Sequence, residues 1–276
     1  MSKYNVILKA YNEKYAVPHF NILGLVYARY ILEECENQKS PVILGVSEKA
    51  VNHFGGYDVV RKSIDGLIKD LNITVPIILH LDHGKSVEAC EKALDAGFDG
   101  AMLDFSAQPL EENIKWTKYL VEKYQDRIIE CEVGAIGKQG DKGIIYAEVE
   151  DALKLSSETN AHMIAAALGS VHGLYKGEPK INFERMKEIN AALNKPLVMH
   201  GGTGLSDEIF KECIKCGIAK INISTELKIA YTSAMREFYL NNKDEHDPIV
   251  VERSAEEAVK SAVRRLIKVF GSDNKA

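Results

Sequence analysis

The amino-acid sequence predicts an α/β protein with the architecture of a (β/α)8 TIM barrel. Eight short apolar runs recur along the chain, and an amphipathic helical stretch follows each of them. The runs are continuously apolar rather than alternating, as expected for parallel strands that are covered on both faces. The length of 276 residues also suits one such barrel. An open doubly wound sheet is the alternative, but no G-x-G-x-x-G motif follows the first strand, which disfavours its dinucleotide-binding form.

The predicted strands and helices alternate in order along the chain. The strands are expected at residues 16–20, 41–47, 76–82, 100–106, 127–134, 162–170, 196–202 and 219–224. The helices that follow them are expected near 23–38, 57–71, 86–97, 110–124, 149–158, 182–193, 206–217 and 225–240. We interpret residues 1–276 as one barrel domain. Within it, residues 241–276 form a C-terminal tail that begins with NNKDEHDP and ends in a helix at 256–270, a candidate for subunit contact.

Composition and charge argue against several functional classes. The chain has 46% hydrophobic and 27% charged residues, as ordinary globular proteins do. Its formal net charge of −5 gives no support for nucleic-acid binding, so an anionic ligand would need a local positive site. There is no apolar run of about 18 residues to span a membrane, and the N-terminus lacks the apolar core of a signal peptide. The five cysteines are scattered and odd in number, which favours a reducing compartment and a cytoplasmic protein.

Polar residues gather where the predicted strands end, which is where barrel enzymes carry their chemistry. His83, His172 and His200 each lie at or just past a strand end, next to glycine. Three histidines around one ion leave a coordination position open, as in catalytic zinc sites, and keep the ion a strong Lewis acid. His80 lies inside its strand and is expected to pack or to orient a ligand, whereas His19 is an alternative ligand from the first strand.

Glycine-rich segments follow the sixth and seventh predicted strands. SVHGLYKGEP at 170–179 and HGGTGLSDE at 200–208 offer backbone N–H groups beside helix starts, and INIST at 221–225 adds amide and hydroxyl groups. Barrel enzymes often bind phosphate after their last two strands, on N–H groups and helix N-termini of this kind. The sequence therefore predicts a phosphate site here, with Lys176 and Lys228 as sources of positive charge.

Four motifs give the chain a resemblance to a known family. LDHG at 81–84, GSVHGLYKGEP at 169–179, MHGGTG at 199–204 and KINISTELK at 220–228 are similar to motifs of the class II, zinc-dependent ketose-bisphosphate aldolases. That family includes fructose- and tagatose-bisphosphate aldolases, and the resemblance runs from about residue 4 to 240 in order and spacing. It implies a lyase of glycolysis and related carbohydrate metabolism that cleaves a phosphorylated ketose reversibly to dihydroxyacetone phosphate and an aldehyde.

The resemblance also implies roles for individual residues. Asp82 is the expected acid/base on the C4 hydroxyl, and Asp104 and Glu132 fall at secondary metal or acid positions. The expected zinc ligands are His83, His172 and His200. The expected substrate and phosphate contacts are Asn21, Ser47, Gly173, Lys176, Gly201, Thr203, Asn222, Ser224 and Thr225. Family members often bind a monovalent cation, Na⁺ or K⁺, near the phosphate loops, and they form homodimers or homotetramers.

The chain departs from the family pattern after the fifth strand and in its tail. The family loop reads G-G-x-E-D, whereas this chain has a shorter GKQGDKG at 137–143, without the glutamate that exchanges the C1 proton. Asp141 or a residue elsewhere is the expected replacement. The tail lacks the D-P-R-x-Y segment, and TELK at 225–228 is closer to the tagatose branch. The ketose is therefore left open, and a metal-dependent hydrolase and a non-catalytic sugar-phosphate-binding protein remain as alternatives.

Overall fold

The computed structural model describes residues 3–136, 146–175 and 178–276. Within these residues, eight parallel strands pair in chain order and close into a barrel, because the last strand pairs with the first. The strands are β1 Val17–Asn21, β2 Val42–Ser47, β3 Ile77–Gly84, β4 Gly100–Leu103, β5 Ile128–Val133, β6 Met163–Ala166, β7 Leu197–Met199 and β8 Ile218–Ile223. Each overlaps one predicted run, so the barrel is confirmed and the open doubly wound sheet is excluded.

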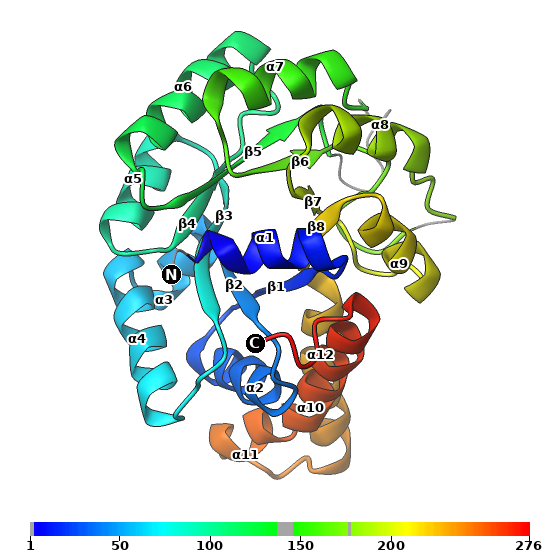
Figure 1. Cartoon of the computed structure of the whole chain (residues 1–276). Coiled ribbons are helices and arrows are strands. Elements are labelled where there is room, and N and C mark those ends of the chain that lie inside the picture. The colour runs from blue at the N-terminus through cyan, green and yellow to red at the C-terminus, as the bar shows by residue number, and fades with distance from the viewer. Residues whose placement is uncertain (1–2, 137–145, 176–177) are drawn as a thin grey trace.

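Helices surround the barrel and alternate with its strands (Figure 1). They are α1 Tyr4–Glu13, α2 Leu25–Asn37, α3 Glu48–Phe54, α4 Tyr57–Asp70, α5 Val87–Asp95, α6 Leu110–Lys123, α7 Val149–Thr159, α8 Phe183–Leu193, α9 Asp207–Lys215, α10 Thr225–Asn241, α11 Pro248–Arg253 and α12 Glu256–Phe270. Every predicted helix is present, and α1, α3 and α11 are additions. None of the described helices is both long and apolar enough to cross a lipid bilayer.

The first helix, α1, covers the N-terminal end of the barrel and lies across it in Figure 1. Ile7 and Ala10 of α1 are fully buried and belong to one apolar cluster with Val17, Ile43 and Ile128, which come from the first residues of the strands. A second, larger apolar cluster lies between the strands and the outer helices. Because apolar side chains fill the N-terminal end, polar groups that could meet a ligand are concentrated at the C-terminal ends of the strands.

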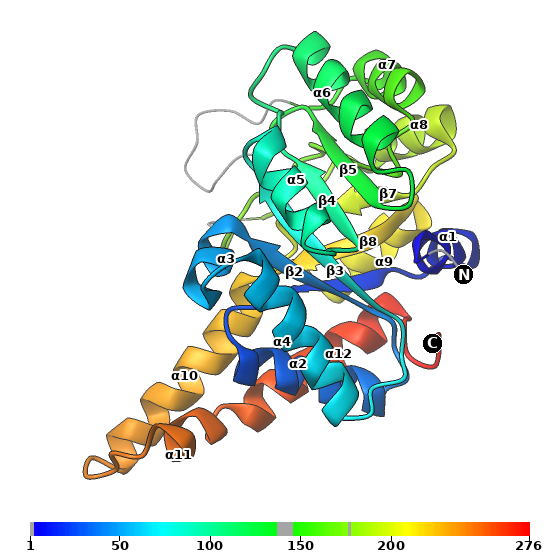
Figure 2. The same ribbon diagram turned by 90° about the vertical axis from the view of Figure 1, so that its left-hand side faces the viewer.

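The C-terminal helix α12 is part of the ring of helices around the barrel. It contacts α2, α9, α10 and β1, and the backbone N–H of Ala16 donates a hydrogen bond to the carbonyl of Phe270 (3.1 Å). Its buried apolar residues are Val259, Val263, Leu266, Ile267 and Phe270. By contrast, α10 and α11 project from the barrel (Figure 2). Within the C-terminal tail at 241–276, α11 therefore projects from the barrel, whereas α12 packs in the ring of helices.

Four polar side chains occupy the middle of the barrel interior. They are His19, His80, Glu130 and Lys220, and all four are fully buried. Each lies two residues before another inward-facing residue nearer the strand end. These later residues are Asn21, Asp82, Glu132 and Asn222, so the four buried side chains form a layer below the open end of the barrel. His19 fills the space beside Gly45 of the neighbouring strand, where a Cβ atom would lie 2.1 Å from the Cε1 atom of His19. The interior therefore has no room for a side chain at residue 45.

Replacing Gly45 with alanine tests how tightly this layer is packed. The new methyl group would collide with the fully buried ring of His19, and we expect the free energy of unfolding to fall by about 1–3 kcal/mol. Gly66→Ala in α4 is the matched control, because a Cβ atom at this exposed glycine meets nothing within 4 Å. The control should leave stability unchanged or raise it by roughly 0.5–1 kcal/mol. Urea denaturation measures the free energy of unfolding of both variants. Equal values for Gly45→Ala and Gly66→Ala would contradict the tight packing of His19 against residue 45.

Candidate active site

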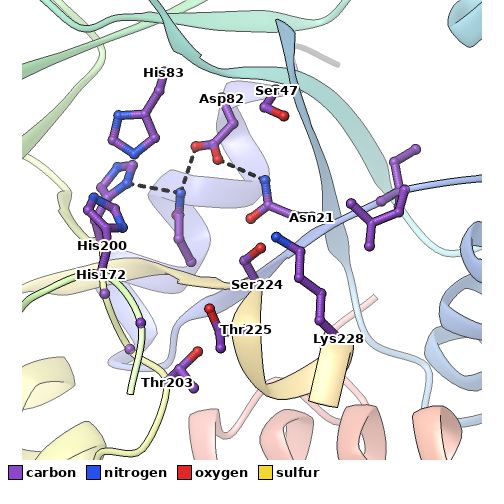
Figure 3. A pocket seen from close by; sticks show the side chains of 16 residues that line it. Asn21, Ser47, Asp82, His83, His172, His200, Thr203, Ser224, Thr225 and Lys228 are labelled. Carbon is purple, nitrogen blue, oxygen red and sulfur yellow. Dashed lines mark hydrogen bonds between the residues drawn. The ribbon is translucent and has the colours of Figure 1, made fainter. Parts of the chain in front are cut away.

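The C-terminal ends of the strands surround a pocket (Figure 3). The predicted site residues that line it are Asn21, Ser47, Asp82, His83, His172, Gly173, His200, Gly201, Thr203, Asn222, Ser224 and Thr225. Asp104 and Glu132 lie outside this pocket and line an adjoining hollow, which His83 and His172 also border. Lys176, Asp141 and the segment 137–143 lie outside the described residues. The fold thus brings together most of the residues that the sequence singled out.

Three histidines from different strand ends face one another in the pocket. The ring centroid of His83 lies 4.6 Å from that of His200 and 5.0 Å from that of His172, and the last two are 5.9 Å apart. One ring nitrogen of each lies within 4.8 Å of the other two, a spacing that suits a shared metal ion. The Nε2 atom of His83 is buried and has no hydrogen-bond partner among the described residues. A buried nitrogen without a partner costs free energy of folding unless it binds a ligand. The three histidines therefore fit a metal ion.

The backbone at the end of β3 directs two successive residues into one pocket. His83 has a left-handed φ of +52°, which is uncommon outside glycine, and the register with β4 shifts between Leu81 and Gly84. Successive side chains of a regular strand point to opposite faces, yet Asp82 and His83 both line the pocket. The irregular strand end therefore turns His83 to the side that Asp82 already faces.

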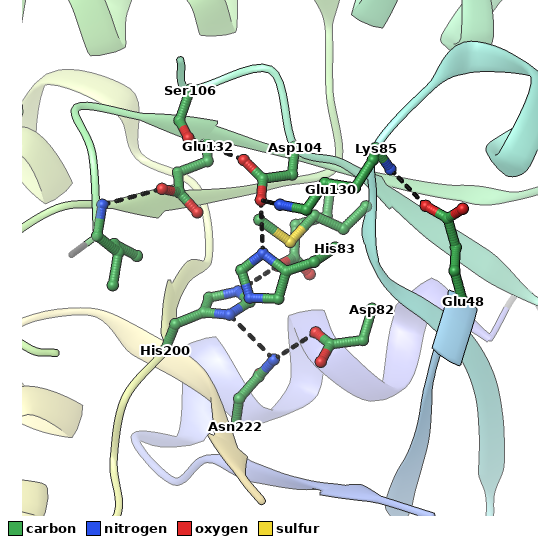
Figure 4. Close-up of polar contacts among 12 residues, drawn as sticks. Glu48, Asp82, His83, Lys85, Asp104, Ser106, Glu130, Glu132, His200 and Asn222 are labelled. Carbon is green, nitrogen blue, oxygen red and sulfur yellow. Dashed lines mark hydrogen bonds and ion pairs between the residues drawn. The ribbon is translucent and has the colours of Figure 1, made fainter. Parts of the chain in front are cut away.

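Two acidic residues lie beside His83 on the side of the adjoining hollow (Figure 4). The Nδ1 atom of His83 lies 2.8 Å from Oδ2 of Asp104, and both Lys85 and the Ser106 hydroxyl (2.8 Å) donate to the Asp104 carboxylate. His83, Asp104 and Glu132 each offer one ligand atom within 4.8 Å of the others. The Oε2 atom of Glu132 is buried without a hydrogen-bond partner in the described part of the chain. This second group could also hold a metal ion.

Burial and neighbouring charges set the protonation of these groups. Burial alone would lower the pKa of His83, but the charge of Asp82 and the hydrogen bond to Asp104 raise this pKa to about 9. Burial and the two neighbouring histidines lower the pKa of His172 to about 3. Burial, together with the charge of Asp104, raises the pKa of Glu132 to about 7. At neutral pH, His172 is therefore neutral and has a lone pair available to a metal ion, whereas His83 must release its proton to bind one.

Asp82 is a buried carboxylate held between two side-chain amides. The Nδ2 atom of Asn21 donates to its Oδ2 (2.7 Å), and the Nδ2 atom of Asn222 donates to its Oδ1 (3.1 Å). Burial alone would raise the pKa of Asp82, but nearby His83 and His19 outweigh burial and hold this pKa well below its usual range. Asp82 is therefore an anion that can accept a proton from a bound ligand. Sequence reasoning missed that Asn21 and Asn222 hold this carboxylate.

A buried ion pair lies beneath His200, and sequence reasoning missed it. The Nε2 atom of His200 lies 2.9 Å from Oε1 of Glu130, and Nζ of Lys220 donates to Oε2 of Glu130 (2.6 Å). Burial opposes ionisation of Glu130, but Lys220 and His200 outweigh it and hold the pKa of Glu130 below its usual range. The one signal in the sequence was a charged residue inside each of the apolar runs RIIECEVG and AKINIS.

The two remaining barrel histidines lie below the pocket. The Nε2 atom of His80 is 3.6 Å from Oε2 of Glu130, and the rings of His80 and His19 meet edge to face with centroids 5.9 Å apart. His19, the alternative metal ligand, is not part of either group of residues that could hold a metal ion among those described. Both rings therefore belong to the buried layer and stay away from the pocket lining.

Two glycine-rich segments, which follow β6 and β7, approach each other closely at the pocket. Gly201 has a φ of +71°, and a Cβ atom there would lie 2.4 Å from the carbonyl oxygen of Val171. The hydroxyl of Tyr175 links the segments, since it donates to the carbonyl of Gly201 (2.9 Å) and accepts from the N–H of Val171 (3.1 Å). Gly173, with a φ of +97°, lies on the same rim. Tyr175 is a further residue that sequence reasoning missed.

Lys228 brings positive charge to the pocket from the first turns of α10 (Figure 3). Its side chain is half-buried, and its ammonium group forms no hydrogen bond or ion pair with the described residues. Burial and the positive charge of Lys49 lower the pKa of Lys228, whereas the negative charge of the Asp82 carboxylate raises it. An ammonium group without a partner at a pocket wall is suited to bind an anionic ligand.

Comparison with known proteins points to one family. The family model described as class II fructose-bisphosphate aldolase matches residues 2–275. The fructose-bisphosphate aldolases of Staphylococcus epidermidis and Geobacillus stearothermophilus are each 43% identical to this chain over 282 residues, which cover 100% of the chain and 99% and 98% of those proteins. The crystal structure of the YdjI aldolase from Escherichia coli K12 is similar with a TM-score of 0.87 and 34% identity, over 99% of this chain and 98% of that one.

These relatives all carry the name aldolase, so they give no support to the hydrolase or to the non-catalytic binding protein. The matching family depends on zinc, and the two residue groups around His83 could hold a metal ion. The family model, the relatives and the geometry of the described barrel agree with one another. The chain therefore belongs to the class II fructose-bisphosphate aldolase family and is an aldolase, a lyase that acts on a carbon–carbon bond.

Proposed function

We propose that this enzyme cleaves a ketose 1,6-bisphosphate, such as fructose or tagatose 1,6-bisphosphate, reversibly to dihydroxyacetone phosphate and an aldehyde. The observation that carries this proposal is the convergence of His83, His172 and His200 beside the carboxylate of Asp82. The names of the similar aldolases support the same class of substrate. The reaction belongs to glycolysis and related carbohydrate metabolism.

In this proposal the three histidines are the ligands of a zinc ion. When bound, the ion polarises the ketone and stabilises the negative charge that develops on its oxygen. The chain's contribution is to hold the ligand rings in place: Asp104 contacts Nδ1 of His83, and Glu130 contacts Nε2 of His200. Glu132 and Asp104, with His83, are secondary metal or acid positions.

Asp82 acts as the base in the cleavage direction and takes the proton of the C4 hydroxyl. The bond between C3 and C4 then breaks, its electron pair passes to the enediolate, and C3 must take up a proton to give dihydroxyacetone phosphate. Its low pKa keeps the carboxylate ionised, and the amides of Asn21 and Asn222 hold its two oxygens. In the condensation direction the protonated Asp82 returns the proton to the new hydroxyl group. Asn222 also lies 3.3 Å from Nδ1 of His200, so it is placed between the acid and the metal ligands and faces the reacting carbon.

The two ends of the pocket suit the two ends of the substrate. The C1 phosphate would bind to backbone N–H groups and hydroxyls at the β6, β7 and β8 ends, where Gly173 and Gly201 have left-handed backbones and α10 begins. The residues assigned to this phosphate are Gly173, Gly201, Thr203, Ser224 and Thr225. Ser47, which lines the same pocket, is assigned to the second phosphate. Lys228, expected from the sequence at the phosphate site after the last strands, is here assigned to the second phosphate instead.

Three further properties belong to the same proposal. A monovalent cation, Na⁺ or K⁺, binds beside the phosphate loops, as in related aldolases. The enzyme assembles as a homodimer or homotetramer. It works in the cytoplasm, in keeping with five cysteines that are all buried and free of disulfides.

Replacing Asp82 with alanine should lower turnover by about 10²–10⁴-fold, because a positioned acid/base contributes a factor of this size. Steady-state cleavage assays measure the effect, and metal analysis serves as the control. Zinc content should stay at the wild-type level, since Asp82 is not one of the three ligands. A variant that loses its zinc together with its activity would show that Asp82 supports the metal site instead.

Removing zinc with a chelator should abolish cleavage of both fructose and tagatose 1,6-bisphosphate, because the proposal makes the zinc ion the Lewis acid that polarises the ketone. Added zinc should restore the activity. The measurement is trapping of dihydroxyacetone phosphate over a panel of phosphorylated ketoses, before and after chelation. Turnover that survives complete zinc removal would contradict the metal mechanism, and the panel shows which ketose is preferred.

Replacing Lys228 with methionine should raise the KM for a ketose 1,6-bisphosphate about 10- to 100-fold, since a hydrogen bond to a charged group is worth about 1.5–3 kcal/mol. The KM for the corresponding ketose 1-phosphate should change little. Lys49→Met is the matched control, because this exposed lysine is nearby but does not line the pocket. Equal losses on both substrates would place Lys228 at the C1 phosphate or at the reacting centre.

A further inference from the structure

The orientation of His200 is set from inside the barrel. Glu130 lies within β5, and His200 directly follows β7. Both side chains are 0% exposed, so water does not compete for their contact of 2.9 Å between Oε1 and Nε2. An ionised carboxylate can only accept hydrogen bonds, and therefore the Nε2 atom of His200 must carry the ring proton.

The second nitrogen of the same ring, Nδ1, consequently carries the lone pair. The Nδ2 atom of Asn222, which can only donate, lies 3.3 Å from Nδ1 of His200 and agrees with an unprotonated Nδ1. His200 also belongs to the group of three histidines that could hold a metal ion. Two neighbours thus select the same tautomer, and this tautomer is the one that presents Nδ1 as a ligand atom.

Lys220 stabilises the ionised carboxylate of Glu130 in the barrel interior. A lone carboxylate in the barrel interior would be protonated or would destabilise the fold. Lys220 lies on β8, is fully buried, and donates to Oε2 of Glu130 at 2.6 Å. The two oxygens of Glu130 therefore have separate partners: Oε2 faces the ammonium group, and Oε1 is left to accept from His200.

We propose that Glu130, balanced by Lys220, is a positioning residue that fixes the tautomer of His200 and strengthens it as a zinc ligand. The inference rests on the proposed metal site but concerns residues that do not line the pocket. The competing explanation is that the ion pair only stabilises the barrel interior. The two explanations differ in what they predict for the ring proton and for zinc affinity, and both quantities can be measured without an activity assay.

The first test observes the ring proton in the wild-type, zinc-free protein. Nitrogen NMR of protein labelled with ¹⁵N-histidine distinguishes the two neutral tautomers and the imidazolium. We expect His200 to carry its proton on Nε2 across the neutral pH range. A proton on Nδ1, or a mixture of tautomers, would overturn the proposal. Because no substitution is involved, this result does not depend on whether a variant folds.

The second test removes the charge of the pair while keeping its shape. In the double variant Glu130→Gln/Lys220→Met neither side chain is charged, so no unpaired charge remains in the interior. We expect its thermal stability without zinc to stay near that of the wild type. Its zinc affinity, measured by competition with a chromophoric chelator, should fall about 10- to 100-fold, as for other groups that hold a metal ligand. A wild-type zinc affinity in this folded variant would overturn the proposal.

An ion pair elsewhere in the chain, with a buried carboxylate and a partly exposed arginine, provides the control. Glu34 of α2 is 1% exposed and accepts from Nε and Nη2 of Arg264 in α12, at 2.7 and 3.0 Å. Glu34→Gln should lower stability and leave zinc affinity unchanged. If the wild type binds no zinc, the proposed metal site fails, while the tautomer measurement still decides the role of Glu130. If the wild type binds zinc and the double variant binds it equally well, only the present inference fails.

Discussion

Side chains along a barrel strand alternate between the interior and the surrounding helices, and this alternation determines what each strand can contribute. On β5, Glu130 and Glu132 face inward, whereas Cys131 between them packs in the outer apolar cluster. On β8 the same holds for Lys220 and Asn222 around Ile221. A strand that supplies a polar group to the open end therefore also places a residue in the layer beneath it. Here that lower layer is polar too, and it touches the site through His200.

The fold could be predicted in large part because each strand is buried on both faces, which leaves a continuous apolar run in the sequence. The first and last residues of these apolar runs predict the strand ends less well. The run at 162–170 extends beyond β6, since Ala167 and Leu168 are buried in the core without being part of the strand. The places of α1 and α12 could not be predicted, because an amphipathic pattern shows that a helix has a buried face but not which surface covers it.

The site was predictable where a residue type is unusual for its surroundings. Histidines and an aspartate at the ends of apolar strands, next to glycines, are such residues, and the structure places His83, His172, His200 and Asp82 in one pocket. The contacts that hold them were not predictable, since they join distant parts of the chain. Glu130 and His200 are 70 residues apart, and they meet only because the barrel closes in a particular register.

The irregular end of β3 has a consequence for protein engineering. A regular strand could deliver either Asp82 or His83 to the pocket, but not both, because adjacent side chains would diverge. The shift in register before Gly84 and the left-handed backbone of His83 remove this restriction. Grafting the pair onto another barrel would therefore require the whole bulged strand end with its glycine, and a graft of the two side chains alone would direct one of them into the surrounding helices.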